Sequence, residues 1–357
     1  MTRYDPARPQ TGPAELGHLM AEEVAEQPDA LTRQLEHGMP DITALATHIR
    51  AVSPRFVLLA ARGTSDHAAL YAKYLIEIAL GLPVGMVSTS TSTIYGAQPD
   101  LRDVLWIAVS QSGGSPDLVD STTRAAAAGA VTVAVTNAPE SALAGAARHH
   151  VDILAGPERA VAATKSYTSQ LLALWLLIDA WRGGDGSQAR DVPALAARVL
   201  ADPTVLEVAQ RYRFVDKIVA TGRGYAYPTA RESALKLMET CYLSAHAFSG
   251  ADLLHGPLAM IDEDRPVLAI APEGTGGRAM KPVLERLAER GADVCLVGDP
   301  TAAGTATSVI ALPTGIDEQL SPILQILPLQ RLAHAMALAR RHDPDAPRGL
   351  RKITQTW

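Results

Sequence analysis

Three charged side chains in the segment ARESALKLMETCYL stand at the spacing of one helical face. Glu232, Lys236 and Glu239 occupy positions i, i+4 and i+7, so a helix would align all three. A stripe of this kind is usually a ladder of surface ion pairs. Apolar residues flank it, however, and an inward stripe would lose solvent, which raises the pKa of a carboxyl group towards that of a useful base. The spacing leaves both interpretations open.

A second segment combines hydroxyl groups with glycines directly after an apolar run. It comprises Ser110, Gln111, Ser112, Gly113, Gly114 and Ser115. Glycines let backbone N–H groups approach a ligand closely, and the N-terminus of the helix expected to follow attracts anions. Thr64 and Ser65 add two hydroxyl groups after an earlier apolar run. We predict that these residues form a cradle for a phosphate monoester; ordinary turn and helix-capping roles are the alternative.

Histidines and glycines elsewhere give weaker signals. His255 precedes a Gly-Pro pair, where a rigid turn could present its ring, although a structural role is more common. His149 and His150 are expected to face solvent, since adjacent residues do not share a face. The Gly-Arg-Gly run at 222–224 is only a fragment of a dinucleotide-binding motif, because Tyr227 stands at the third glycine position. No metal-ligand spacing occurs, and we expect neither a metal nor an organic cofactor.

The candidate groups depend on elements that recur along the chain. Continuous apolar runs alternate with helical patterns, which is typical of parallel strands buried on both faces. Two sets of such runs follow one another, at 56–63, 103–110 and 130–137, then at 217–224, 265–272 and 292–299. The offset is 161 residues from Gly63 to Gly224 and 162 residues from Gly129 to Gly291. The sequence therefore contains two copies of one unit.

The repeat predicts an α/β fold with two tandem units, each a parallel sheet flanked by helices. Ligands of such sheets bind outside the carboxyl ends of the strands, where the candidate loops lie. The expected division is a helical segment over 1–45, a first unit over 46–185, a second unit over 195–340 and a tail over 341–357. The loop of the second unit at 272–277 has lost most of its hydroxyl groups, so we expect a single cradle, in the first unit.

Composition excludes several classes of protein. With 32 basic and 38 acidic residues among 357, the net charge is −6 and the pI is about 5.9, which argues against a nucleic-acid partner. Cys241 and Cys295 are too few for a disulfide scaffold and suit a reducing cytoplasm. The apolar run at 171–181 is too short to cross a membrane and is expected to be a buried helix. Residues 1–15 hold no apolar export signal, so we expect a cytoplasmic protein without a membrane partner.

Six segments of the chain resemble the sugar isomerase (SIS) family, in the family's order. They are ARGTSDHAALYAKYLIE, SQSGGSPD, AGPERAVAATKSYTSQL, GRGYAYPTARESALKLMETCYLSAHAF, LLHGPLAMI and DPDAPRGLRKITQTW. The likeness extends from about Met20 to the C-terminus and points in particular to the isomerase half of the glutamine–fructose-6-phosphate aminotransferases. It implies two flavodoxin-like SIS domains in tandem, in agreement with the repeat, and a sugar phosphate as the substrate.

The resemblance also implies roles for matching positions. The residues that would hold the sugar phosphate are Thr64, Ser65, Ser110, Gln111, Ser112 and Ser115. Glu239 is similar to the base that moves a proton between C1 and C2 of the open-chain sugar, and Glu232 and Lys236 are similar to its polar supports. His255 would assist ring opening from the neighbouring subunit, which implies a homodimer. Lys352 is similar to a lysine in the tail that forms an imine with the open-chain ketose.

Three departures from the family pattern bear on function. Ala163 stands where a serine is frequent and Gly114 where a glutamate is frequent, so the accepted sugar is left open. The chain begins Met-Thr-Arg, without the terminal cysteine of the family's glutaminase. We therefore expect an aminosugar-phosphate deaminase/isomerase that converts glucosamine 6-phosphate and water to fructose 6-phosphate and ammonia. Another aldose–ketose phosphosugar isomerase, a deglycase and a non-catalytic sugar-phosphate sensor are the alternatives.

Overall fold

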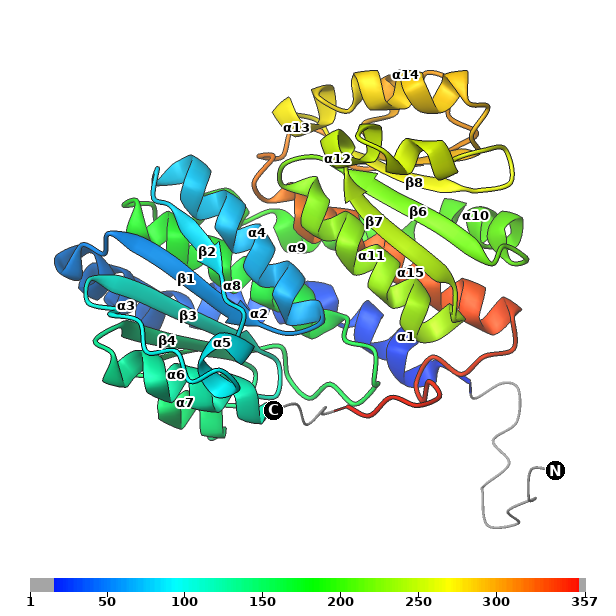
Figure 1. Cartoon of the computed structure of the whole chain (residues 1–357). Coiled ribbons are helices and arrows are strands. Elements are labelled where there is room, and N and C mark those ends of the chain that lie inside the picture. Colours follow the sequence, from blue (N-terminus) through cyan, green and yellow to red (C-terminus); the bar gives the residue numbers. More distant parts are fainter. Residues whose placement is uncertain (1–15, 353–357) are drawn as a thin grey trace, which may run out of the picture.

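Two five-stranded parallel sheets form the frame of the chain (Figure 1). The computed structural model describes residues 16–352. The first sheet has the order β2-β1-β3-β4-β5. Its strands are β1 Phe56–Ala61, β2 Val84–Met86, β3 Val104–Ser110, β4 Val131–Thr136 and β5 His149–Asp152. Every residue of β3 is buried, because this strand lies at the centre of the sheet with helices on both sides.

The second sheet repeats this arrangement with the order β10-β9-β8-β6-β7, and its strands also pair in parallel. They are β6 Lys217–Gly222, β7 Ser244–Ser249, β8 Val267–Ala271, β9 Val294–Gly298 and β10 Ser308–Ala311. All six strands predicted from continuous apolar runs are present. The expected α/β fold of two tandem units is confirmed.

The residue pattern does not reveal the outer strands β2, β5, β7 and β10. His149 and His150 lie in β5, and the expectation that both face solvent is wrong, because both side chains are half-buried. The ring of His149 packs against that of His48, with 4.7 Å between their centres. His150 Nε2 lies 2.8 Å from Thr136 Oγ1. Pairing of β5 with β4 draws both histidines into the edge of the sheet.

Helices cover both faces of the first sheet. Helices α3, α4 and α8 share one apolar core with it, while α6 and α7 pack on the other face. The helices of this part are α3 Met39–Val52, α4 Thr64–Ala79, α5 Ser90–Thr93, α6 Pro116–Ala127, α7 Ala142–Ala146 and α8 Lys165–Trp181. All 17 residues of α8 are buried, which confirms the buried helix expected at 171–181. Within residues 16–352, none of the helices has the length and apolar character of a membrane span.

The second sheet is covered in the same way, by α10, α11 and α15 on one face and by α12 and α14 on the other. Its helices are α9 Val192–Ala201, α10 Thr204–Tyr212, α11 Ala226–Cys241, α12 Gly250–Leu254, α13 Thr275–Arg278, α14 Lys281–Glu289 and α15 Ser321–Ala339. Short 3₁₀ turns are η1 Ser187–Ala189, η2 Pro257–Met260 and η3 Pro300–Ala302. The apolar cluster that contains α8 also contains α11 and α15, so one core runs through both units.

The two ends of the described chain meet at the first helix (Figure 1). Of the expected helical segment over 1–45, residues 16–45 contain α1 His18–Ala25, α2 Gln27–His37 and the start of α3, and residues 1–15 lie outside the described residues. At the start of α1, the Asp345 carboxylate accepts hydrogen bonds from the backbone N–H groups of Leu19 at 2.9 Å and Met20 at 2.8 Å. This contact fixes the path of the C-terminal segment past the N-terminal helices.

Candidate active site

Two helix N-termini lie next to each other at the carboxyl edge of the first sheet. Strands β1 and β3 pair in parallel, with Ala61 opposite Val109, and each leads through a short loop into a helix. Thr64 and Ser65 are the first residues of α4, and Ser115 immediately precedes α6. The partial positive charges of both helix ends are thus at the same edge of the sheet. The two groups of hydroxyls predicted as a cradle therefore lie at the same edge of the sheet, after neighbouring strands.

Glycine is required at two positions of these loops. Gly63 has φ 55° and ψ −131°, a backbone conformation that side chains with a Cβ rarely adopt. Gly113 has φ 61°, and a Cβ there would lie 2.1 Å from Ser141 Oγ. Any larger residue at either position would alter the course of the loop.

The serines of the second loop keep their own protons available. Ser110 Oγ accepts a hydrogen bond from the Gly113 N–H at 3.1 Å. Ser112 Oγ accepts one from the Gly114 N–H at 3.3 Å. Each hydroxyl can therefore still donate to an anion. The Ser115 hydroxyl has no hydrogen-bond partner among residues 16–352, and the Gln111 side chain is half-buried.

Helix α11 turns its charged stripe inward. The side chains of Glu232 and Lys236 are 0% exposed, and that of Glu239 is 21% exposed. Lys236 Nζ lies 3.3 Å from Glu232 Oε1 and also forms an ion pair with Glu239. Burial alone lowers the pKa of Lys236, but Glu232 and Glu239 raise it by more, so its pKa is above the usual range. A charged lysine thus lies between two carboxylates, and the stripe is not a surface ladder.

A hydroxyl of α4 connects this stripe to the predicted cradle. Thr64 Oγ1 accepts a hydrogen bond from Lys236 Nζ at 3.1 Å and donates one to Glu232 Oε1 at 3.0 Å. The neighbouring Ser65 Oγ accepts a hydrogen bond from Gln170 Nε2 of α8 at 2.9 Å. The start of α4 and the acid–base stripe therefore form one hydrogen-bonded cluster.

The tail places Lys352 beside the start of α8. Its Nζ donates hydrogen bonds to Glu158 Oε2 at 2.8 Å and to the Ala160 carbonyl at 2.7 Å. Glu158 also accepts hydrogen bonds from the Ser166 N–H at 3.0 Å and hydroxyl at 2.7 Å. Burial raises the pKa of Glu158, but Lys352 and Ser166 lower it by more, so the net shift is downward. Ser166 is one helical turn before Gln170, which bonds Ser65, so Lys352 lies on the cradle side of α8.

His255 stands apart from the other predicted residues. It follows α12, its side chain is exposed, and its Nδ1 donates to the Ala251 carbonyl at 2.8 Å. Strand β7, which precedes α12, is an edge strand, so this side of the second sheet is open. Within the described part of a single chain, His255 has no hydrogen bond or ion pair with the acid–base cluster.

The SIS domain family matches this chain twice, over residues 53–180 and 213–340. Each matched region contains one of the two sheets, and together they make up more than half of the chain. The chain belongs to the SIS domain family. The repeat visible in the sequence is therefore a tandem of SIS domains.

Named relatives and solved structures extend this likeness. Glutamine–fructose-6-phosphate aminotransferase [isomerizing] from Methanothermobacter thermautotrophicus is 36% identical over 340 residues, which are 94% of this chain and 57% of that protein. The chain thus spans less than two thirds of the length of this relative. A Silicibacter pomeroyi protein, provisionally assigned as a phosphosugar isomerase, is 36% identical with a TM-score of 0.83 over 92% of this chain and 99% of its own. The C-terminal domain of glucosamine-fructose-6-phosphate aminotransferase from Francisella tularensis is 25% identical, with a TM-score of 0.84 over 94% of this chain and 100% of its own.

In the second SIS domain, a glutamate of the same domain binds the loop at 272–277, which corresponds to the loop at 110–115 of the first domain. Glu318 accepts hydrogen bonds from the backbone N–H groups of Thr275 at 2.7 Å and Gly276 at 2.6 Å. This loop follows β8, which has the place in the second sheet that β3 has in the first. A carboxylate of the protein itself therefore occupies the N–H groups of this loop.

Three side chains that the residue pattern did not single out hold the site together. His67 Nδ1 lies 2.7 Å from Glu232 Oε2, Gln170 bonds Ser65, and Glu158 bonds the tail lysine. His67 follows the predicted hydroxyls at helical spacing, which is a signal that could have found it. Glu158 and Gln170 act across long stretches of sequence, and no local pattern marks them.

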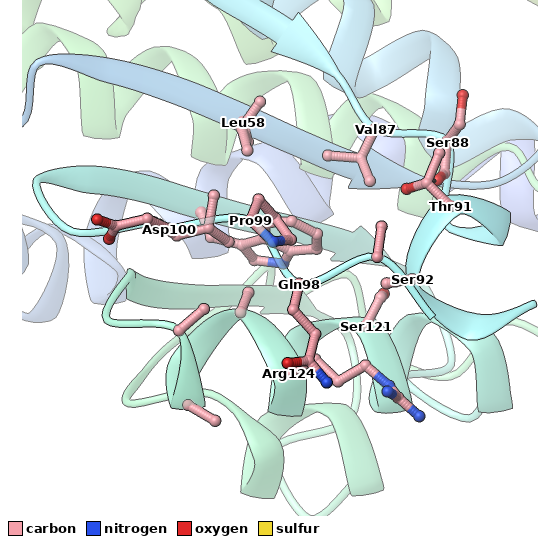
Figure 2. Close-up of a pocket in the computed structure, with 16 residues that line it drawn as sticks. Leu58, Val87, Ser88, Thr91, Ser92, Gln98, Pro99, Asp100, Ser121 and Arg124 are labelled. Carbon is pink, nitrogen blue, oxygen red and sulfur yellow. Dashed lines mark hydrogen bonds between the residues drawn. The ribbon is translucent and has the colours of Figure 1, made fainter. Parts of the chain in front are cut away.

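A separate groove of about 960 Å³ lies on the α6 side of the first sheet (Figure 2). Its lining includes Leu58 and Trp106, and its two charged side chains, Asp100 and Arg124, already form ion pairs with neighbours. The groove exists because the connection from β2 to β3 contains only the four-residue helix α5. It holds no acid–base cluster, so we locate the candidate site between α4 and α11. Residues 16–352 contain no group of three or more His, Cys, Asp or Glu that could hold a metal ion.

Proposed function

We propose that this SIS protein is an aminosugar-phosphate deaminase/isomerase. In the proposed reaction, glucosamine 6-phosphate and water give fructose 6-phosphate and ammonia. The observation that carries the proposal is the cluster in which Thr64, at the start of α4, bonds both Glu232 and Lys236. It joins an anion-binding helix end to an acid–base group, and a phosphorylated substrate of C1/C2 isomerisation needs both.

The proposed phosphate site is formed by the starts of α4 and α6. Its side chains are Thr64, Ser65, Ser110, Gln111, Ser112 and Ser115. The hydroxyl protons and the helix N-termini supply the positive charge that a phosphate requires, so the site needs no lysine or arginine. A phosphate held there is anchored to the same helix that bonds the acid–base stripe, which orients the sugar carbons towards α11.

Glu239 is the proposed base. It takes the proton from C2 of the open-chain aminosugar and delivers a proton to C1, so that the aldehyde becomes an alcohol and C2 becomes an imine. Water then adds to the imine carbon, ammonia leaves, and the ketose forms. Partial exposure makes Glu239 accessible to a substrate, whereas Glu232 and Lys236 are sealed inside and act as its supports. This proton transfer requires a positioned carboxylate and neither a metal nor an organic cofactor.

Two further residues complete the proposed site. Lys352, held at Glu158 by the tail, would engage the ketose carbonyl as an imine. His255, exposed on its own chain, would reach the site of a second subunit and assist ring opening. We therefore propose a homodimer with shared active sites.

Neither Cys241 nor Cys295 is available as a nucleophile. Cys241 and Cys295 are both buried, and burial raises the pKa of each thiol to about 11. A buried thiol that stays protonated at neutral pH is a poor nucleophile, so neither can attack glutamine. Two free cysteines also suit the reducing cytoplasm that we propose as the location.

Ammonia release tests the proposed reaction. The purified protein is incubated with glucosamine 6-phosphate and a small panel of related aminosugar phosphates, and ammonia and ketose phosphate are measured in coupled assays. We expect the two products in equal amounts. Aldose–ketose interconversion without ammonia would favour a different phosphosugar isomerase, and release of a substituted amine would favour a deglycase. Binding without turnover of any substrate would favour a sensor.

A further inference from the structure

Both oxygens of the buried Glu232 carboxylate are held by one helix of the other SIS domain. Thr64 Oγ1 donates to Oε1 at 3.0 Å, and His67 Nδ1 lies 2.7 Å from Oε2. Thr64 and His67 are three residues apart on α4, so they share a helical face. Because Glu232 belongs to α11 of the second domain, this clamp crosses the boundary between the domains.

The clamp influences how Lys236 is shared between the two glutamates. Lys236 Nζ lies 3.3 Å from Glu232 Oε1 and is closer to Glu239. A buried carboxylate needs hydrogen-bond donors on both oxygens. Here the imidazole N–H of His67 supplies the donor for Oε2, so Glu232 does not have to draw the ammonium of Lys236 towards itself. The ammonium of Lys236 can therefore remain in its ion pair with Glu239.

The contribution of His67 comes from its hydrogen bond rather than from apolar packing. Its residue exposure is 7%, and it lines a cavity of about 420 Å³ together with Gly63, Arg231 and Leu235. The ring thus has a carboxylate on one side and a cavity on the other. A side chain that restores the donor can replace such a histidine, whereas an apolar side chain of similar size cannot.

We propose that His67 is a positioning residue for the acid–base group. Its Nδ1–H fixes Glu232, and through Lys236 this sets the position of the Glu239 carboxylate. The inference rests on the proposed function, because Glu239 is the base only in that reaction. Since His67 contacts the supports and not the substrate, loss of its N–H is expected to reduce kcat more than it changes KM.

Two substitutions separate the hydrogen bond from the bulk of the ring. His67→Asn places an amide N–H near the position of the Nδ1–H, whereas His67→Leu fills the space and removes the donor. We expect His67→Leu to lower kcat by about 10- to 100-fold, the cost of misplacing a catalytic group, with little change in KM. His67→Asn should recover most of this loss. His48→Leu is the matched control, because His48 is half-buried against His149 at the opposite edge of the first sheet, and it should change neither constant.

A spectroscopic readout tests the clamp independently of turnover. In protein labelled with ¹⁵N-histidine, the Nδ1 resonance of His67 is assigned by its loss in His67→Asn. It should shift when Glu232→Gln removes the carboxylate. Absence of that shift would overturn the inference whatever the activity, as would equal losses of kcat in His67→Leu and His67→Asn. A shift in a protein that turns over no sugar phosphate would support the clamp but refute the proposed function and, with it, the catalytic role of His67.

Discussion

At the scale of single residues, two glutamates of one helix have the same chemistry and different surroundings. Glu232 is sealed and held by Thr64, His67 and Lys236. Glu239 is 21% exposed and pairs with Lys236. It lies two residues before α11 ends. A fixed support needs the first environment, and a base that must reach a substrate carbon needs the second.

Glu239→Gln is expected to remove turnover while preserving binding. The amide keeps the shape of the side chain but cannot accept the substrate proton, so kcat should fall by about 10²- to 10⁴-fold. Ammonia release measures kcat, and calorimetry with fructose 6-phosphate measures affinity. Glu285→Gln, on the exposed surface of α14, is the control and should match the unmodified protein. Turnover close to normal in Glu239→Gln would show that another group is the base.

At the scale of elements, two contacts of the C-terminal tail have different roles. Asp345 accepts hydrogen bonds from the start of α1, and Lys352 donates to Glu158 near the start of α8. The first contact sets the path of the tail, and the second brings an amine to the cradle side of the first domain. The second contact depends on the charge of Glu158, so it responds to pH.

Acid is expected to release Lys352 from Glu158. The pKa of the folded Glu158 carboxyl is below its ordinary value of 4.5, so the pair adds stability that is fully present above that value and is lost as the pH falls through the lower, folded pKa. Lys352→Met should therefore lower the free energy of unfolding by about 1–3 kcal/mol at pH 7. Chemical denaturation between pH 7 and pH 3 should show this difference shrinking towards acid.

The neighbouring Arg351 provides the control for this experiment. Its side chain is exposed, so Arg351→Met removes an equal charge without breaking a buried contact and should have little effect at any pH. A stability difference for Lys352→Met that stayed constant from pH 7 to pH 3 would mean that Glu158 is not the titrating partner.

At the scale of the whole molecule, the repeat could be predicted and the meeting of the two halves could not. Central strands such as β3 are almost entirely apolar because both faces are buried. The edge strands β5 and β7 are partly exposed and contain polar residues, so they form no continuous apolar run. The cradle follows a local order of strand, loop and helix. Thr64 and Glu232, by contrast, are 168 positions apart, and no periodicity shows that α4 and α11 touch. The helical spacing of the charged stripe shows that its three residues share one face of the helix, but not whether that face points to the core or to solvent.

The fold also leaves His255 on an exposed turn beside the edge strand β7. Near that edge, Ala245 and Ala247 of β7 line a cavity with Leu235 and Met238 of α11, and Met238 is 41% exposed. In a twofold symmetric dimer, the same surface of each subunit faces its partner. We expect light scattering to show a dimer at micromolar concentration, with each His255 directed towards the site of the other subunit.

Mixing two inactive variants tests whether the sites are shared. Glu239→Gln and His255→Ala should each have little activity alone. In a mixed dimer, one site has the intact Glu239 of one chain and the intact His255 of the other, so random mixing by co-expression should restore about a quarter of normal activity. The control mixes Glu239→Gln with Lys236→Met, which should restore none, because both residues serve the site of their own chain. If mixed dimers purified through two different tags stay inactive for the first pair, His255 does not act across the interface. Recovery in the first pair alone would require that the two residues come from different subunits.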